Sequence, residues 1–256
     1  MDKARPRPIL DHVVVLVTHD TLRSLEDRLK ASLLVSPGGT HADGLTENKL
    51  IVLDDGSYIE LIAFIDGIDP DRRRAHRWGL VPENTAIDWA YTLPHESDFA
   101  GVQRRLGAAG VAYSHAEPGG RTLADGTDIK WAVAFPRDGP GRLPFWCLDR
   151  TPRRLRVPSS AGTRHPCGAR GVARLVVRTR PDDVTDLTKA YDALHGDEGD
   201  VRGRWSLDVC TGGRRFVTVE ASESRRGLEM VLLGGTASSI EVVAGLRLCI
   251  ERETME

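Results

Sequence analysis

The feature that most constrains the fold is an internal repeat, in which one order of elements recurs three times at a spacing of roughly 75 to 85 residues. In each copy, a run of apolar and β-branched residues typical of a buried strand precedes an amphipathic helix and two further strand-like runs. A single unit of this kind leaves one face of its sheet uncovered. It must therefore pair with another unit to complete a core, and two units side by side would form a curved sheet with a cleft.

The sequence divides into a first unit over residues 9–65, a second over 85–150 that pairs with the first, a third over 170–234, and a C-terminal tail over 235–256. Loops rich in Arg, Pro and Gly separate the units and mark natural boundaries. In the first unit, an Asp-Asp-Gly turn joins the two closing strands. We therefore predict an α+β fold of repeated βαβββ units, forming a curved mixed sheet around a cleft.

Composition excludes several classes of protein. The 256 residues contain 35 Lys and Arg against 37 Asp and Glu, a formal net charge of −2. Without a basic excess to neutralise phosphates, nucleic acid is not an expected partner. No run of 18 apolar residues is present, so we expect no membrane span. The four cysteines form no C-x-x-C pair, which suggests free thiols in a reducing cytoplasm.

Five segments, in order over nearly the whole chain, resemble the glyoxalase-like family of the vicinal oxygen chelate superfamily: LDHVVVLV, PGGTHADGLTENKLIVLDDGSYIELIAF, IDWAYTL, RLPFWCLDR and HPCGARGVARLVV. The resemblance implies paired βαβββ units around a cleft that binds a small molecule. It also implies a divalent metal in that cleft. Zn, Ni, Mn, Mg and Fe are all compatible with the sequence.

Two polar residues lie inside strands of the first unit, where burial requires a partner. His12 is flanked by Leu10 and by valines, and Glu60 stands between Ile59 and Leu61. A carboxylate among aliphatic residues costs several kcal/mol unless it is paired or coordinated. The resemblance implies that His12 and Glu60 are metal ligands. The alternative is that the two residues face opposite sides of the sheet, or pair with each other or with an arginine.

Further residues are candidates for the same cleft. His41, in a glycine-rich loop, is a predicted metal ligand and catalytic group beside Glu60. His165 is a predicted ligand or general base. Predicted substrate-binding residues are Asn48, as a hydrogen-bond donor, Arg121, as a clamp for a carboxylate or enolate, and the tryptophans Trp89 and Trp131. For each, a purely structural role is the competing interpretation.

The ligand set depends on which units share a cleft. The second unit offers Asp88 or Trp89 in its first strand and Trp146 and Cys147 in its last, none of them a clear match. In the third unit, Glu229 matches Glu60, but Arg174 stands where His12 would be, and arginine cannot bind a cation. Pairing of units one and three would therefore add Glu229 to the site.

The favoured function is a small-molecule enzyme that uses a divalent metal to polarise neighbouring oxygens for lyase or isomerase proton transfer. A dioxygenase is possible if His12, His41 and Glu60 hold iron. The competing hypothesis is a metal-free protein that binds or sequesters a small molecule such as an antibiotic. An odd number of units further predicts a homodimer, or a third unit that caps the first two.

Overall fold

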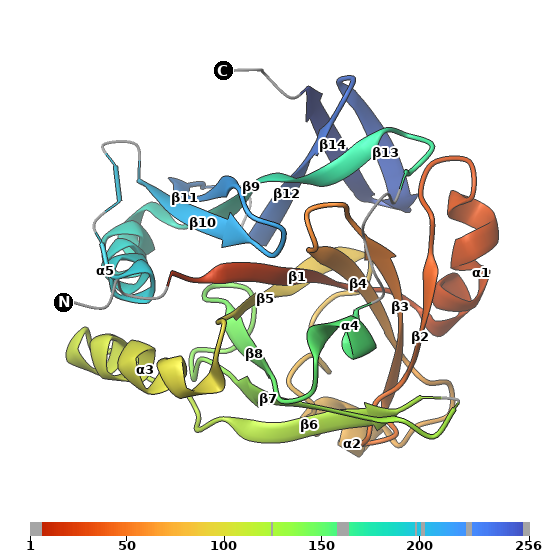
Figure 1. The fold of residues 1–256 in the computed structure, drawn as a ribbon, viewed down its shortest axis with the longest axis horizontal. Helices are drawn as coiled ribbons and strands as arrows, with labels where there is room; N and C mark the ends of the chain where they lie inside the picture. Colours follow the sequence, from red (N-terminus) through yellow and green to blue (C-terminus); the bar gives the residue numbers. More distant parts are fainter. Residues whose placement is uncertain are drawn as a thin grey trace.

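The computed structural model describes residues 7–123, 125–157, 164–197, 199–200, 203–223 and 227–252. These residues form fourteen strands in one continuous mixed sheet, which is strongly curved (Figure 1). The predicted α+β class with a curved mixed sheet is confirmed. Among the described residues, no helix is long and apolar enough to cross a membrane.

The N-terminal half contains two similar runs of elements. The first run comprises β1 (Ile9–Leu16), α1 (His19–Leu29), β2 (Ser36–Thr40), β3 (Thr46–Val52) and β4 (Tyr58–Phe64), followed by α2 (Pro70–Ala75). The second comprises β5 (Thr85–Thr92), a 3-10 turn (Glu96–Asp98), α3 (Phe99–Ala108), β6 (Glu117–Thr122), β7 (Asp128–Ala134) and β8 (Phe145–Asp149), followed by α4 (Arg153–Arg156). The strand order within them is β1-β4-β3-β2 and β5-β8-β7-β6, so the two runs share one topology.

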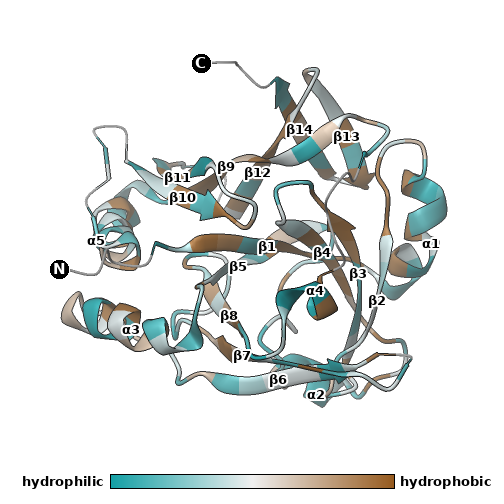
Figure 2. Cartoon of the chain, in the orientation of Figure 1, coloured by the Kyte–Doolittle hydropathy of each residue, from teal (hydrophilic) through white to brown (hydrophobic). Residues whose placement is uncertain are grey.

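Strand β1 joins these two runs because it pairs in parallel with β4 on one side and antiparallel with β5 on the other. Its residues alternate between two cores. Val13 and Val15 belong to the large core that also holds the leucines of α1, while Val14 and Leu16 pack on the cleft side. Helix α1 begins at a Thr18 cap and turns its leucines inward, and its outer face is polar (Figure 2).

The C-terminal half has a related but shorter plan. It contains β9 (Ala169–Thr179), a 3-10 turn (Pro181–Asp183), α5 (Val184–His195), β10 (Arg204–Val209), β11 (Arg214–Ala221), β12 (Gly227–Gly234), β13 (Ser238–Val243) and β14 (Leu246–Arg252). Strand β11 lies parallel to β9 as β4 does to β1, and β12 lies antiparallel to β9 as β5 does to β1. Strand β14 lies parallel to β12 as β8 does to β5.

This pairing differs from the predicted third unit over 170–234. Strand β12 corresponds to an opening strand, grouped with β13 and β14, instead of the closing strand of the unit before it. The sequence does not show the partner of β12, because the local pattern of β10, β11 and β12 is the same whether β12 pairs with β11 or with β9. The homodimer stays a prediction, but its premise of an odd number of units changes, since β9 finds its partner strand within the chain.

Aromatic packing joins the two halves around His195, at the end of α5. Its Nδ1 donates to the Ser206 carbonyl at 2.9 Å, and its ring stacks on Tyr191 with centroids 6.0 Å apart and meets Tyr91 edge-on. Burial lowers the pKa of this imidazole to about 4, because the apolar surroundings disfavour the charged form. The packing between the N-terminal and C-terminal halves therefore requires His195 to be neutral.

We predict that this residue makes the protein less stable in mild acid. Below a pH of about 6.5 the unfolded chain binds a proton at His195 that the folded chain does not bind until about pH 4, so the free energy of unfolding falls over that window by about 3 kcal/mol. The variant His195→Asn keeps a donor for the Ser206 carbonyl and should lose this part of the pH dependence. Urea unfolding at pH 7 and pH 4.5 measures it.

The exposed His115 gives the matched control, because His115→Asn removes an imidazole that lies on the surface. This control should keep the wild-type difference in stability between the two pH values. An unchanged difference in His195→Asn would contradict the assignment.

Candidate functional site

A cavity of about 290 Å³ opens between the two N-terminal runs. Its wall from the first run is polar and its wall from the second is largely aromatic. The polar wall includes His12, His41, Thr46, Asn48 and Glu60, and the other includes Arg121, Trp131, Val133, Phe135, Phe145 and Cys147.

His12 and Glu60 face the cavity together. In the β1·β4 register Val14 lies opposite Glu60, and His12 is two residues before Val14, so both side chains project from one face of the sheet. His12 Nε2 lies 3.4 Å from Glu60 Oε2, and both side chains are more than nine-tenths buried. The alternative that they point to opposite sides does not hold.

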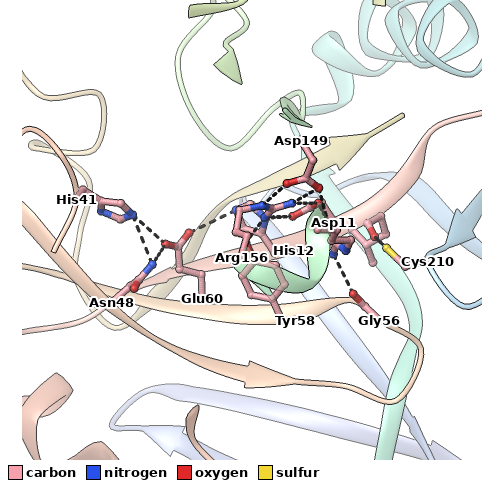
Figure 3. Close-up of polar contacts among 12 residues, drawn as sticks. Asp11, His12, His41, Asn48, Gly56, Tyr58, Glu60, Asp149, Arg156 and Cys210 are labelled. Carbon is pink, nitrogen blue, oxygen red and sulfur yellow. Dashed lines mark hydrogen bonds and ion pairs between the residues drawn. The ribbon is translucent and has the colours of Figure 1, made fainter. Parts of the chain in front are cut away.

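His41 and Asn48 complete this polar cluster (Figure 3). His41 Nε2 lies 3.5 Å from Glu60 Oε1, the same oxygen that accepts a hydrogen bond from the Asn48 amide. The Nδ1 atom of His41 is hydrogen-bonded to the Thr46 hydroxyl at 2.7 Å. Strand β3 contributes Thr46 and Asn48 two residues apart, and so on one face, while the loop after β2 contributes His41.

Electrostatics in the cluster favours a charged carboxylate. Burial alone would raise the pKa of Glu60, but the imidazoles of His12 and His41 outweigh it and hold the pKa well below its ordinary range. Burial would likewise lower the pKa of His12, but its bonds to Asp11 and Glu60 raise the pKa instead. The cluster is therefore an anion held between two histidines.

Behind His12 lies a fully buried carboxylate. His12 Nδ1 donates to Asp11 Oδ1 at 2.6 Å. Neighbours in a regular strand point to opposite faces, but the register of β1 against β5 shifts between Leu10 and His12, a β-bulge that lets Asp11 and His12 meet. Burial would raise the pKa of Asp11, and the nearby arginines Arg153 and Arg156 overcome it and lower the pKa strongly.

Arg156, on α4, links this carboxylate to the second run. It donates to Asp11 at 2.8 and 2.9 Å, to Asp149 at 2.7 and 2.9 Å, and to the Tyr58 hydroxyl at 2.8 Å. The Tyr58 ring in turn stacks on His12 with centroids 4.6 Å apart. The orientation of His12 is therefore set on one edge by Asp11 and on one face by Tyr58.

The other predicted site residues divide into two groups. Arg121 and Trp131 line the cavity with His12, His41, Asn48 and Glu60. Trp89 does not, because it alternates onto the opposite face of β5 and is fully buried in the large core. His165 does not either: its Nδ1 accepts from the Leu34 amide at 3.0 Å and its Nε2 donates to the Val52 carbonyl at 3.1 Å. It fastens the loop after α4 to the first run.

The structure also answers which units share the cleft. The first and second runs do, and the cleft-facing residues of β8 are Phe145 and Cys147, which bring no further carboxylate. Asp88 is held by Arg77 at 3.0 Å and by the Trp78 indole at 3.1 Å. The C-terminal candidates are elsewhere: Glu229 pairs with Arg178, and Arg174 pairs with Glu251.

Comparison with known proteins agrees with this geometry. Residues 10–194 match the model of a family described as a glyoxalase-like domain, over well more than half of the chain. The chain belongs to this family. No curated protein sequence gives a significant match. Family membership rests on the segment that contains the whole cavity.

Two solved structures show how far the fold of this glyoxalase-like chain extends. A hypothetical protein from Staphylococcus aureus is 13% identical and superposes with a TM-score of 0.68, covering 96% of this chain and 100% of that one. A mutant of 4-hydroxymandelate synthase from Streptomyces coelicolor is 14% identical with a TM-score of 0.53, covering 89% and 71%. Both likenesses concern the fold alone.

Several cavity residues were not predicted from the sequence. His76 and Trp78, which follow α2, line the cavity, although the Arg-rich segment that holds them resembles a solvated loop. Asp11 and Arg156 form the support of His12. A charged residue directly beside His12 in an apolar strand was the one available signal, whereas Arg156 becomes visible only when α4 folds over the cleft.

Among the described residues, no group of three or more His, Cys, Asp and Glu side chains is arranged as a preformed cation site. The donor set nevertheless suits a divalent metal, since two imidazoles and one carboxylate are the ligands of many Mn, Fe and Zn sites. Both histidines also have Nδ1 fixed by an oxygen and turn Nε2 toward Glu60. Metal-binding histidines are typically held in this way.

We predict that Asp11→Asn strongly destabilises the fold. The change removes the fully buried carboxylate from Arg156 and Arg153, which then keep only the Asp149 carboxylate, and breaking a buried pair costs about 3–5 kcal/mol. Chemical unfolding with guanidinium chloride measures the loss. The exposed pair of Glu96 with Arg150 supplies the control, since Glu96→Gln should cost less than about 1 kcal/mol. Equal effects of the two changes would contradict the role of Asp11.

Proposed function

We propose that this glyoxalase-like chain is a small-molecule enzyme whose His12, His41 and Glu60 hold a divalent cation for lyase- or isomerase-type proton transfer. The observation that carries the proposal is the orientation of the two imidazoles. Each has Nδ1 fixed by Asp11 or Thr46 and presents Nε2 to one carboxylate inside a cavity. A cation bound there would supply Lewis-acid stabilisation of negative charge on substrate oxygens.

Glu60 and the aromatic wall would have separate roles beside the cation. Glu60 has two oxygens with different partners, because Oε2 faces His12 while Oε1 faces His41 and the Asn48 amide. Glu60 would hold the cation as a charged carboxylate, because its low pKa makes it a better ligand than proton acceptor. The largely aromatic opposite wall makes the cavity less polar on that side, which strengthens the electrostatic interactions near the cluster.

A second candidate function is metal-free binding of a small molecule. It is favoured by the hydrogen bond from Asn48 to Glu60 and by the approach of the same amide to His41 Nε2 at 3.4 Å, since these contacts satisfy the cluster without a cation. In that case the cavity would retain its ligand by packing against the aromatic wall. The measurement of metal content separates the two candidates.

We expect purified protein without a histidine tag to contain or take up one equivalent of a divalent metal. Elemental analysis, and calorimetric titration with Mn²⁺ or Zn²⁺, measure this. His12→Ala and Glu60→Gln remove a donor each and should lower the metal affinity at least about tenfold. The exposed His95 provides the control, because His95→Ala should bind metal as the wild type does.

Folding of each variant is checked by circular dichroism, so that a loss of metal is not confused with unfolding. A folded wild-type protein that takes up none of Mn, Fe, Ni or Zn would contradict the metalloenzyme proposal and leave the metal-free candidate.

A further inference from the structure

Arg121 brings a positive charge to the cavity. Its guanidinium donates from Nη2 to the Arg156 carbonyl at 3.0 Å, and its buried Nε–H has no hydrogen-bond partner. Among the ion pairs of the described residues, none includes Arg121. The side chain is only partly buried, so its charge can meet an anion that enters the cavity.

The carboxylates nearest to Arg121 are engaged elsewhere. Glu60 faces two imidazoles and the Asn48 amide, and Asp11 and Asp149 are held by Arg156. Burial lowers the pKa of Arg121, although the Tyr58 hydroxyl and Glu60 oppose this. The donors of Arg121 left for a bound ligand are therefore those of Nη1 and the second hydrogen of Nη2, because Nε is shielded by the protein.

An aromatic surface lies beside this guanidinium. In the β6·β7 register, Gly119 lies opposite Trp131, and Arg121 is two residues along β6 on the same face. Gly119 allows the Trp131 indole to lie against β6, because a Cβ there would stand 2.5 Å from Trp131 Nε1. The rings of Phe135 and Phe145, with centroids 5.0 Å apart, continue the wall.

The size of the cavity limits the ligand. Its volume of about 290 Å³ is at the lower end of small-molecule sites, which span roughly 300–1,000 Å³. A single ring with a short side chain fits this space. One guanidinium with a planar fork suits one carboxylate.

We infer that the ligand of this cavity is a small aromatic carboxylate, with its carboxylate on Arg121 and its ring against Trp131 and Phe145. The inference rests on the proposed function in placing substrate in this same cavity. Arg121 lies on the wall that faces Glu60. A ligand whose carboxylate is bound by Arg121 would therefore turn its other substituents toward the His12–Glu60–His41 cluster.

The test uses the full chain kept metal-free with a chelator, so that a carboxylate cannot bind through a cation. Phenylacetate and its neutral analogue phenylacetamide are titrated by calorimetry or by NMR. We expect phenylacetate to bind about tenfold or more tightly than the amide, because a charge-assisted hydrogen bond to Arg121 is available to it alone. Cyclohexylacetate should bind more weakly than phenylacetate, since it lacks the aromatic ring.

Variants assign these preferences to residues. Arg121→Gln should abolish the preference for phenylacetate over the amide, and Arg121→Lys, which keeps the charge but not the fork, should give an intermediate preference. Trp131→Leu should remove the preference for phenylacetate over cyclohexylacetate. Arg104 lies exposed on α3, away from the cavity, so Arg104→Gln is the matched control and should bind all three probes as the wild type does.

Three outcomes would overturn the inference: equal binding of acid and amide, an unchanged preference in folded Arg121→Gln, or no saturable binding of phenylacetate at millimolar concentrations. Tighter binding of phenyl phosphate than of phenylacetate would contradict the carboxylate assignment. Metal uptake by the same preparations is measured separately. If the wild-type protein takes up metal but does not prefer phenylacetate to the amide, this inference alone is rejected. If it prefers phenylacetate but takes up no metal, the metal proposal alone is rejected.

Discussion

A carboxylate with no solvent exposure organises this protein. Asp11 lies at a bulge in β1, where it meets His12 on one side and Arg156 and Arg153 on the other. Taking such a charge out of water is expensive, so the surrounding residues are fixed by the need to compensate it. One contact network thereby orients His12 and holds α4, which follows the second run, beside the cleft between the two runs.

The two walls of the cleft carry different side chains although their strands have the same topology. Strand β4 presents Tyr58 and Glu60 to the cleft, whereas β8 presents Phe145 and Cys147. The polar groups that can hold a cation or move a proton are therefore gathered on one wall. The other wall supplies shape, aromatic surface and the guanidinium of Arg121, which suits it to select a ligand.

The C-terminal half repeats the architecture without repeating the site. Where the first half has a buried histidine and glutamate, the half that contains β9 presents Arg174 and Arg178 in ion pairs that are partly exposed. Its contribution is to packing, since β10 extends the sheet beside β1 and α5 brings His195 into an aromatic core with Tyr91. Such charged pairs add little to stability in contact with water.

The sequence by itself determined the α+β class, because strand and helix periodicities are local, and the resemblance of its segments indicated the glyoxalase-like family. It also pointed to His12, Glu60, His41, Asn48, Arg121 and Trp131, since polar residues inside apolar strands and glycine-rich turns are visible one by one. Only the tertiary structure decided which runs share a cleft, that Trp89 and His165 lie outside it, and that Arg156 lies inside it. These outcomes depend on strand partners and on the bulge at Asp11, and pairing between distant segments leaves no local periodic signal.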